Sequence, residues 1–383
     1  MVGSVTGYAS SFVLVLAGAR AVGATAEQAA SGLLVVCVVQ GATAVILSLA
    51  HRLPVSIAWS TPGAAVLAGA SAVTRDFGAA VAAFAVAGVL LAVTGLWPWL
   101  ARTMTRIPAP IASAMLAGIL FPICLSPVLA AVRMPLLALP AIVVWAVLAR
   151  FAPRWAVPAA VVATAVAVVV AAGPDWARGA RIAPHVEFVP LHPDPLVIVA
   201  LAVPLYLVTM AGQNIPGFTV LRTYGYPTPA RSVLAGTGIA SMVAAPFGGQ
   251  TLNLSALSAA IIVGDVHTPK DRRWIGAVTG GSLYLVIGLF SGVAGALVRA
   301  SPPILIESAV GLALLGALVA AIGGALEDPG GRVVAAGTFV TVASGIVVAG
   351  LGSAFWGLVV GAVLWLLLRV GRRGTESGPP VAR

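Results

Sequence analysis

The sequence predicts an all-α polytopic membrane protein with about 14 transmembrane segments. The chain of 383 residues is 60% hydrophobic and 8% charged, with a mean hydropathy of +1.07, whereas roughly a quarter of the residues of a soluble globular protein are charged. Long runs carry no charge at all, among them residues 79–96, 156–172 and 196–210. This composition argues against a soluble protein.

The expected spans follow one another with short connections, each close to the roughly 20 residues that a helix needs to cross a bilayer. They are placed at residues 4–22, 28–50, 53–71, 77–100, 107–128, 133–150, 155–173, 193–221, 229–246, 247–263, 274–298, 302–323, 331–350 and 353–370.

The longest polar connection, residues 173–195, comes after the seventh span and separates halves of similar length. Seven spans in each half force the second half into the opposite orientation, which is the inverted-repeat architecture of many secondary transporters. If both termini are cytoplasmic, most of the 21 Lys and Arg residues lie inside, as the positive-inside rule requires. The expected parts are a first repeat (1–173), an extracytoplasmic linker (174–192), a second repeat (193–371) and a cytoplasmic tail (372–383).

The remaining composition excludes several other classes of protein. The net charge is +10, but the basic residues occur singly or in small groups between apolar spans, so they are interpreted as topology signals and not as a nucleic-acid surface. Cys37 and Cys124 lie inside apolar runs, which favours packing over a disulfide or a metal site. No catalytic constellation, phosphate loop or metal-ligand spacing is present, so we expect no enzyme activity, no cofactor and no metal.

The third and tenth spans are interrupted. In the third, Ser60-Thr61-Pro62-Gly63 predicts a half-helix that begins near Thr61, because Ser or Thr before Pro is typical of a helix N-terminus. In the tenth, Pro246 and the pair Gly248-Gly249 precede Gln250, Thr251 and Asn253, and a second half-helix is expected to begin near Gln250. Interrupted segments at matching places in two repeats indicate a transporter's binding site.

The predicted site favours a small anion. Two half-helix N-termini would bring unpaired backbone N–H groups and positive dipole ends together without any basic side chain. The eighth span adds the amides of Gln213 and Asn214 just before Pro216. Each feature also has a structural interpretation, namely a proline kink, a glycine loop or hydrogen bonding between helices. Gln40 is interpreted as packing.

Glu307 is the carboxylate that falls inside an expected span. An acid within the membrane is a candidate for proton coupling, but Arg299 is close in the sequence and an ion pair at the membrane interface is favoured.

Four stretches resemble the benzoate/proton symporter family of bacterial inner membranes: "GYASSFVLVL", "PVSIAWSTPGAAVLA", "PLYLVTMAGQNIPGFTVLRTYGY" and "APFGGQTLNLSALSAAI" followed by "HTPKDRRW". The resemblance implies the fold of the nucleobase transporters, with a core domain, a gate domain, and a short strand plus a half-helix in segments three and ten. By this resemblance the site is lined by Tyr8, Ser10, Ser11, Ser60, Thr61, Gln213, Asn214, Gly248, Gly249, Gln250, Thr251 and Asn253.

The nucleobase carriers of this fold bind ring N–H groups with carboxylates, and this chain has none in the Gln213-Asn214 or Gln250–Asn253 stretches. The expected function is import of benzoate or a related aromatic carboxylate with protons, by alternating access, in a bacterial inner membrane. Benzoate itself comes from the resemblance, since the residues indicate only a small anion. Another small anion, a nucleobase or a passive anion channel are the alternatives, and a homodimer is one possible assembly.

Overall fold

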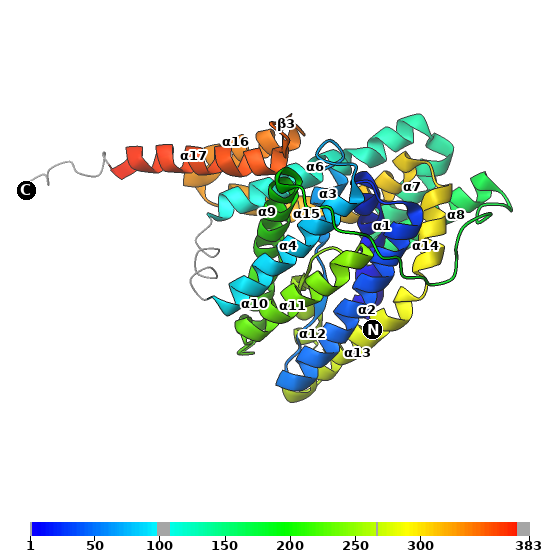
Figure 1. The fold of residues 1–383 in the computed structure, drawn as a ribbon, viewed down its shortest axis with the longest axis horizontal. Coiled ribbons are helices and arrows are strands. Elements are labelled where there is room, and N and C mark those ends of the chain that lie inside the picture. The colour runs from blue at the N-terminus through cyan, green and yellow to red at the C-terminus, as the bar shows by residue number, and fades with distance from the viewer. Residues whose placement is uncertain (1, 98–107, 266, 374–383) are drawn as a thin grey trace, which may run out of the picture.

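The structure is a computed structural model that describes residues 2–97, 108–265 and 267–373, and helices dominate it (Figure 1). The first half of the chain forms α1 (Val2–Ala21), α2 (Ala26–His51), β1 (Ile57–Trp59), α3 (Thr61–Ala68), α4 (Phe77–Leu96), α6 (Ala109–Arg133), α7 (Pro135–Phe151) and α8 (Pro153–Ala172). The second half forms α9 (Pro195–Thr209), a π-helical turn (Met210–Asn214), α10 (Ile215–Thr223), α11 (Ala230–Ala244), β2 (Leu252–Leu254), α12 (Ala256–Val263), α13 (Trp274–Gly288), α14 (Ser291–Ala300), α15 (Pro303–Leu326), α16 (Arg332–Ala343), β3 (Val347–Val348), β4 (Leu351–Gly352) and α17 (Ser353–Arg373).

The described chain contains six helices that are long and apolar enough to cross a membrane. The bent pair α13–α14 brings the number to seven if it forms one span. The other expected spans coincide with shorter helices, such as α7, or with interrupted segments, such as β1–α3. The chain is therefore a multi-span protein, while helix length alone supports only part of the expected 14 segments.

Two expected spans have a different form from the one predicted. The helix expected over 331–350 ends at Ala343, because the following residues turn back at Gly345 and Gly350, both with positive φ, into the small β3–β4 hairpin. The helix expected over 274–298 is broken after Gly288 and bends by 55° into α14. Gly288 precedes this break and Ser291-Gly292 follow it, and glycine and serine are residues at which helices commonly kink.

The helices pack in two groups. One consists of α6, α7, α8, α15, α16 and α17, in which α6 packs most extensively against α15, and α16 and α17 project together to one side (Figure 1). In the other group α2, α4, α9, α11 and α13 surround the short elements α3, β1, β2 and α12. Helix α1 touches both groups, since it packs on α3 and also on α8 and α15.

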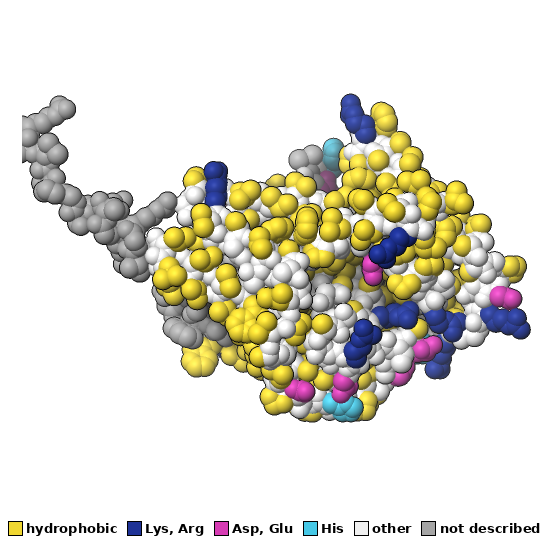
Figure 2. Space-filling model, turned by 90° about the horizontal axis from the view of Figure 1, so that it is seen from above, with side chains coloured by type: hydrophobic (Ala, Val, Ile, Leu, Met, Phe, Trp, Pro, Cys, Tyr) yellow, Lys and Arg dark blue, Asp and Glu magenta, His cyan; other side chains and the backbone are white. Residues whose placement is uncertain are grey.

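Large apolar side chains cover much of the surface, and charged side chains are few on the face that Figure 2 shows, most of them toward its lower right edge. On α6 and α7, for example, Val132, Leu136 and Phe151 are exposed to 78%, 88% and 78%. Soluble monomers rarely expose apolar area on this scale. The surface is therefore suited to contact with lipid.

The linker between the halves is fixed to the second group of helices. The Val189 N–H donates to the Pro246 carbonyl (2.8 Å), and the His192 ring lies 3.1 Å from the Asp76 carboxylate at the start of α4. Slight burial raises the pKa of the Asp76 carboxyl, but hydrogen bonds from His192 and from the backbone N–H groups of Gly78 and Ala79 outweigh this and hold the pKa below its usual value.

Candidate functional site

Segment three forms the strand and half-helix that its sequence predicts. Ile57 and Trp59 suit an extended strand, and the Ser60 hydroxyl accepts the Gly63 N–H (3.0 Å), which ends the strand and caps α3. Pro62 in the first helical turn has no N–H that would need a partner. The half-helix begins at Thr61 as expected, with Ser60 as the capping residue.

Segment ten has the same form, but its half-helix begins later than predicted. Gly248 turns the chain with φ +82°, and residues Leu252–Leu254 form β2 before Ser255 caps α12 through the Ser258 N–H (3.3 Å). The prediction of a start near Gln250 was therefore wrong. Pairing of residues 252–254 with β1 keeps this stretch extended, and a partner strand distant in sequence is not visible in the local pattern.

The two strands pair antiparallel and give the segment pair a polar face. Ile57, Ala58 and Trp59 lie opposite Leu254, Asn253 and Leu252, and the pairing continues through Ser60 N–H to the Thr251 carbonyl and Ser255 N–H to the Ser56 carbonyl, both 2.8 Å. Side chains alternate between the faces of a strand, and opposite residues share a face. One face, which we call the polar face, therefore carries Ser56, Ala58, Ser60, Thr251, Asn253 and Ser255.

A buried hydroxyl cluster lies at one end of the polar face. Thr209, the last residue of α9, donates to the Ser60 hydroxyl at 2.7 Å and lies 3.3 Å from the Thr251 hydroxyl. All three residues are fully buried. The cluster fixes the end of α9 to the start of α3, so the position of the cap depends on the eighth segment.

The amides of the eighth segment hold the tenth segment in place. Pro216 cannot donate to the turn before it, and the helix widens there into the π-helical turn. From this turn Asn214 Oδ1 accepts the Leu254 N–H (2.9 Å), and Gln213 Oε1 accepts the Ala256 N–H (3.3 Å). Both predicted residues are thus at the site, with their carbonyl oxygens engaged by β2 and the first turn of α12.

These contacts change one physical premise of the prediction. The sequence led us to expect unpaired N–H groups at both half-helix N-termini, but side chains accept three of them: Ser60 accepts from Gly63, Gln213 from Ala256, and Ser255 from Ser258. Capping satisfies donors that a bound anion would otherwise need. The positive dipole ends remain, with fewer free donors than expected.

Several buried polar atoms at the site have no hydrogen-bond partner among the described residues. They are both amide atoms of Gln250, Oδ1 of Asn253 and the Tyr8 hydroxyl. Buried polar groups are nearly always satisfied in native proteins, and those that are not call for a ligand or water. These unpartnered atoms belong to residues that the sequence singled out.

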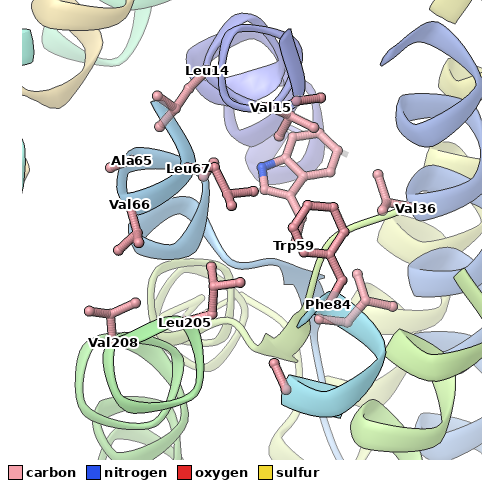
Figure 3. Close-up of a cluster of buried hydrophobic side chains, with 14 of the residues drawn as sticks. Leu14, Val15, Val36, Trp59, Ala65, Val66, Leu67, Phe84, Leu205 and Val208 are labelled. Carbon is pink, nitrogen blue, oxygen red and sulfur yellow. The ribbon is translucent and has the colours of Figure 1, made fainter. Parts of the chain in front are cut away.

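An aromatic cluster joins α1 to β1. The Trp59 indole N–H donates to the Ser11 hydroxyl (3.0 Å), and its ring lies 5.9 Å from Tyr8 and 5.8 Å from Tyr284 of α13. Figure 3 shows Trp59 among buried apolar side chains from α1, α2, α3, α4 and α9. Tyr8 and Ser11 are thus brought next to segment three; the side chain of Ser10 lies outside the described ones.

Three predicted residues lie elsewhere or have another local role. A Cβ on Gly248 would come within 3.1 Å of the Gln28 carbonyl oxygen, and one on Gly249 within 2.6 Å of the Ala244 side chain, so both glycines allow close packing at the turn. Glu307 is exposed on α15. The expected ion pair between Glu307 and Arg299 is absent from the described residues, because the Arg299 guanidinium donates instead to the carbonyls of Arg178 and Gly179.

Sequence reasoning missed Thr209 and Ser255. Ser255 precedes an apolar run, a pattern typical of a helix N-cap, so it could have been found. Thr209 carries no such signal, since only the folded chain brings it to Ser60.

Comparisons with known proteins identify the family of the chain. A family model described as benzoate membrane transport protein matches residues 1–367. The chain is 34% identical over 373 residues to the inner membrane protein YdcO of Escherichia coli (strain K12), which covers 95% of this chain and 93% of that protein. It is 31% identical over 374 residues to the benzoate membrane transport protein of Acinetobacter baylyi, with 94% and 92% covered.

Two solved structures with a similar fold are those of transporters. The transmembrane domain of the cyanobacterial bicarbonate transporter BicA matches with a TM-score of 0.59 and 16% identity, over 94% of this chain and 96% of that chain. The murine Slc26a9 anion transporter in the inward-facing state matches with a TM-score of 0.63 and 13% identity, over 97% and 68%. The chain is a membrane transport protein and not an enzyme, and it belongs to the benzoate membrane transport protein (BenE) family.

Proposed function

We propose that this protein imports benzoate or a related aromatic carboxylate together with protons, by alternating access. The observation that carries the proposal is a set of unpartnered buried amide atoms between two capped half-helices, on Asn253 of the polar face and on Gln250 just before β2. No basic side chain lies on the polar face. The Trp59 and Tyr8 rings provide an aromatic surface on the opposite face of β1, next to α1. Membership in a family described by benzoate transport supports the choice of substrate.

The proposed architecture is 14 segments in two inverted repeats of seven, residues 1–173 and 193–371, with 174–192 as the outer linker and 372–383 as a cytoplasmic tail. A constant sequence interval supports it: Ile57 and Leu252 begin the strands, Ser60 and Ser255 cap the half-helices, and Gly69 and Gly264 end them at the same spacing. We propose that α6, α7, α8, α15, α16 and α17 form the gate and the other helices the core. The protein would lie in the bacterial inner membrane with both termini in the cytoplasm.

The alternatives differ in substrate or in energy coupling. Another small anion is the first alternative substrate, because the two solved transporters of similar fold are named for bicarbonate and for anions. A nucleobase is less suited, because no carboxylate lies on the polar face to bind its N–H groups. A passive anion channel would equilibrate its substrate and could not concentrate it.

The test is uptake of radiolabelled benzoate into proteoliposomes, with and without an inward proton gradient and with empty liposomes as control. Accumulation above the external concentration, abolished by a protonophore, is the expected result. Equilibration without accumulation would indicate a channel. Inhibition of uptake by uracil but not by unlabelled benzoate would indicate a nucleobase as the substrate and would exclude benzoate.

A further inference from the structure

The polar face carries a hydrogen-bond acceptor that lacks a donor, and a bound carboxylate has no hydrogen to donate to it. Asn253 uses its Nδ2 to donate to the Leu254 carbonyl (3.1 Å), and its Oδ1 is buried with no donor among the described residues. Exchanging the two amide atoms would place two oxygens against each other at Leu254, so Oδ1 is the free atom. An ionised carboxylate only accepts hydrogen bonds, whereas a protonated carboxyl group has one O–H to donate.

The side-chain amide oxygen of Gln250, three residues before Asn253, also needs a hydrogen-bond donor. It is 3% exposed, and both Oε1 and Nε2 lack a partner in the described part of the chain. A primary amide with both atoms free can form a reciprocal pair with a carboxylic acid, accepting its O–H and donating to its C=O. A carboxylate would satisfy only Nε2 and would set its own oxygen against Oε1.

The site also lacks a group that would balance a bound negative charge. Three first-turn N–H groups of α3 and α12 are already accepted by Ser60, Gln213 and Ser255. No Lys or Arg lies on the polar face, and a charge taken out of water without a partner is costly. Ala58, half-buried and opposite Asn253, leaves only a methyl group beside the free oxygen.

The described side chains provide no obvious carrier for a separate proton at this place. None of the described aspartates and glutamates is buried, and Glu307 lies exposed on α15. The titratable groups around Trp59 of β1 are the phenols of Tyr8 and Tyr284, with the thiol of Cys37 beside Tyr8, and Tyr206 bonds to Thr94 on the neighbouring helix α4. Phenols and thiols ordinarily ionise above neutral pH, so they stay protonated and do not exchange a proton in the physiological range.

From these observations we infer that the substrate is bound and carried as the neutral carboxylic acid, with the coupled proton on its own carboxyl group. The inference rests on the proposed function and deepens it. Outside, a proton from water joins the carboxylate; the O–H donates to Asn253 or Gln250 during transport; inside, the O–H bond breaks and the proton passes to cytoplasmic water. One proton and one carboxylate then cross together with no net charge.

The first test uses two probes that compete with radiolabelled benzoate for binding to the wild-type protein in nanodiscs. Benzamide is neutral and has both a donor and an acceptor, while benzenesulfonate carries the same ring and is a permanent anion. We expect benzamide to compete and benzenesulfonate not to compete. Competition by benzenesulfonate overturns the inference and leaves the proposed function standing, whereas a folded protein that neither binds nor takes up benzoate removes both.

The second test varies pH and the acidity of the substrate. If the neutral acid binds, apparent affinity falls about tenfold for each pH unit above the acid's own pKa, and substituted benzoates of graded acidity shift this curve by the difference in their pKa values. One common midpoint for all substrates would place the proton on the protein and refute the inference. Asn253→Ala should weaken the binding of benzoate and of benzamide alike. Gln40→Leu, which removes a buried amide on α2, should change the binding of neither.

Discussion

The bond between Thr209 and Ser60 permits a quantitative test of how the eighth segment positions the third. Ser60→Ala removes the cap of α3 and also the acceptor of the Thr209 hydroxyl, both at fully buried positions. Loss of a serine N-cap costs about 1 kcal/mol, and loss of a neutral buried hydrogen bond about 0.5–1.5 kcal/mol. The expected destabilisation is about 1.5–2.5 kcal/mol.

Ser255→Ala is the matched control, because it removes the corresponding cap of α12. The Ser255 hydroxyl accepts one longer bond, 3.3 Å from the Ser258 N–H, and its other contact is with the same residue's hydroxyl. We expect a loss of about 0.5–1 kcal/mol, the lower part of the range for helix caps. Ser60→Ala should therefore be the more damaging of the two substitutions.

A double-mutant cycle with Thr209→Val isolates the bond itself. The free energy of unfolding is measured for both single variants and the double variant in mixed micelles with increasing denaturing detergent. Because Thr209 can turn to the Thr251 hydroxyl at 3.3 Å when Ser60 is gone, the coupling energy should be about 0.5–1 kcal/mol. Additivity within about 0.3 kcal/mol would refute the link between the two segments.

Three further outcomes follow from single positions. Gly248→Ala should destabilise the protein in thermal unfolding by about 1–2 kcal/mol, because φ is +82° there; an unchanged midpoint would refute this. Gln40→Leu should stabilise it by about 1–3 kcal/mol, because both buried amide atoms lack a partner among the described residues; a loss of stability would indicate that Gln40 is satisfied by a ligand or water. The lowered pKa of Asp76 stabilises the fold above the unfolded-state pKa, and this contribution disappears as pH falls through the lower folded pKa. Asp76→Asn keeps a capping oxygen, so the free energy of unfolding at neutral pH should fall by less than about 1 kcal/mol, and the difference from wild type should vanish in acid. A difference in this free energy that persists in acid would contradict the assignment.

The interrupted segments show how far the sequence could go. Ser60 before Thr61-Pro62 is a local start signal, and α3 begins where that signal places it. In segment ten the glycine pair and the amides also marked an interruption, but the helix begins at Ala256 because β2 pairs with a strand far away in sequence. Local propensity contains no information about a strand that is distant in sequence. It therefore placed the interruption correctly and the helix start wrongly.

The interpretation of the amides had a similar limit. The sequence identified Gln213, Asn214, Gln250 and Asn253 as unusual in apolar surroundings, since side-chain amides seldom occur in lipid-facing helices without a reason. It could not distinguish an amide that supports the backbone from one that is free. The structure separates them: Gln213 and Asn214 accept N–H groups of segment ten, while Gln250 and Asn253 keep unpartnered atoms.

By itself the sequence determined that the chain lies in a membrane, that two segments are interrupted and which amides are unusual in apolar surroundings, because hydrophobicity, proline and capping residues act locally. Only the tertiary structure decided the register of β1 and β2, the contact of Thr209 with Ser60 and the bond from the Ala256 N–H to Gln213. These contacts join residues that are distant along the chain, and their geometry depends on packing that no local pattern encodes.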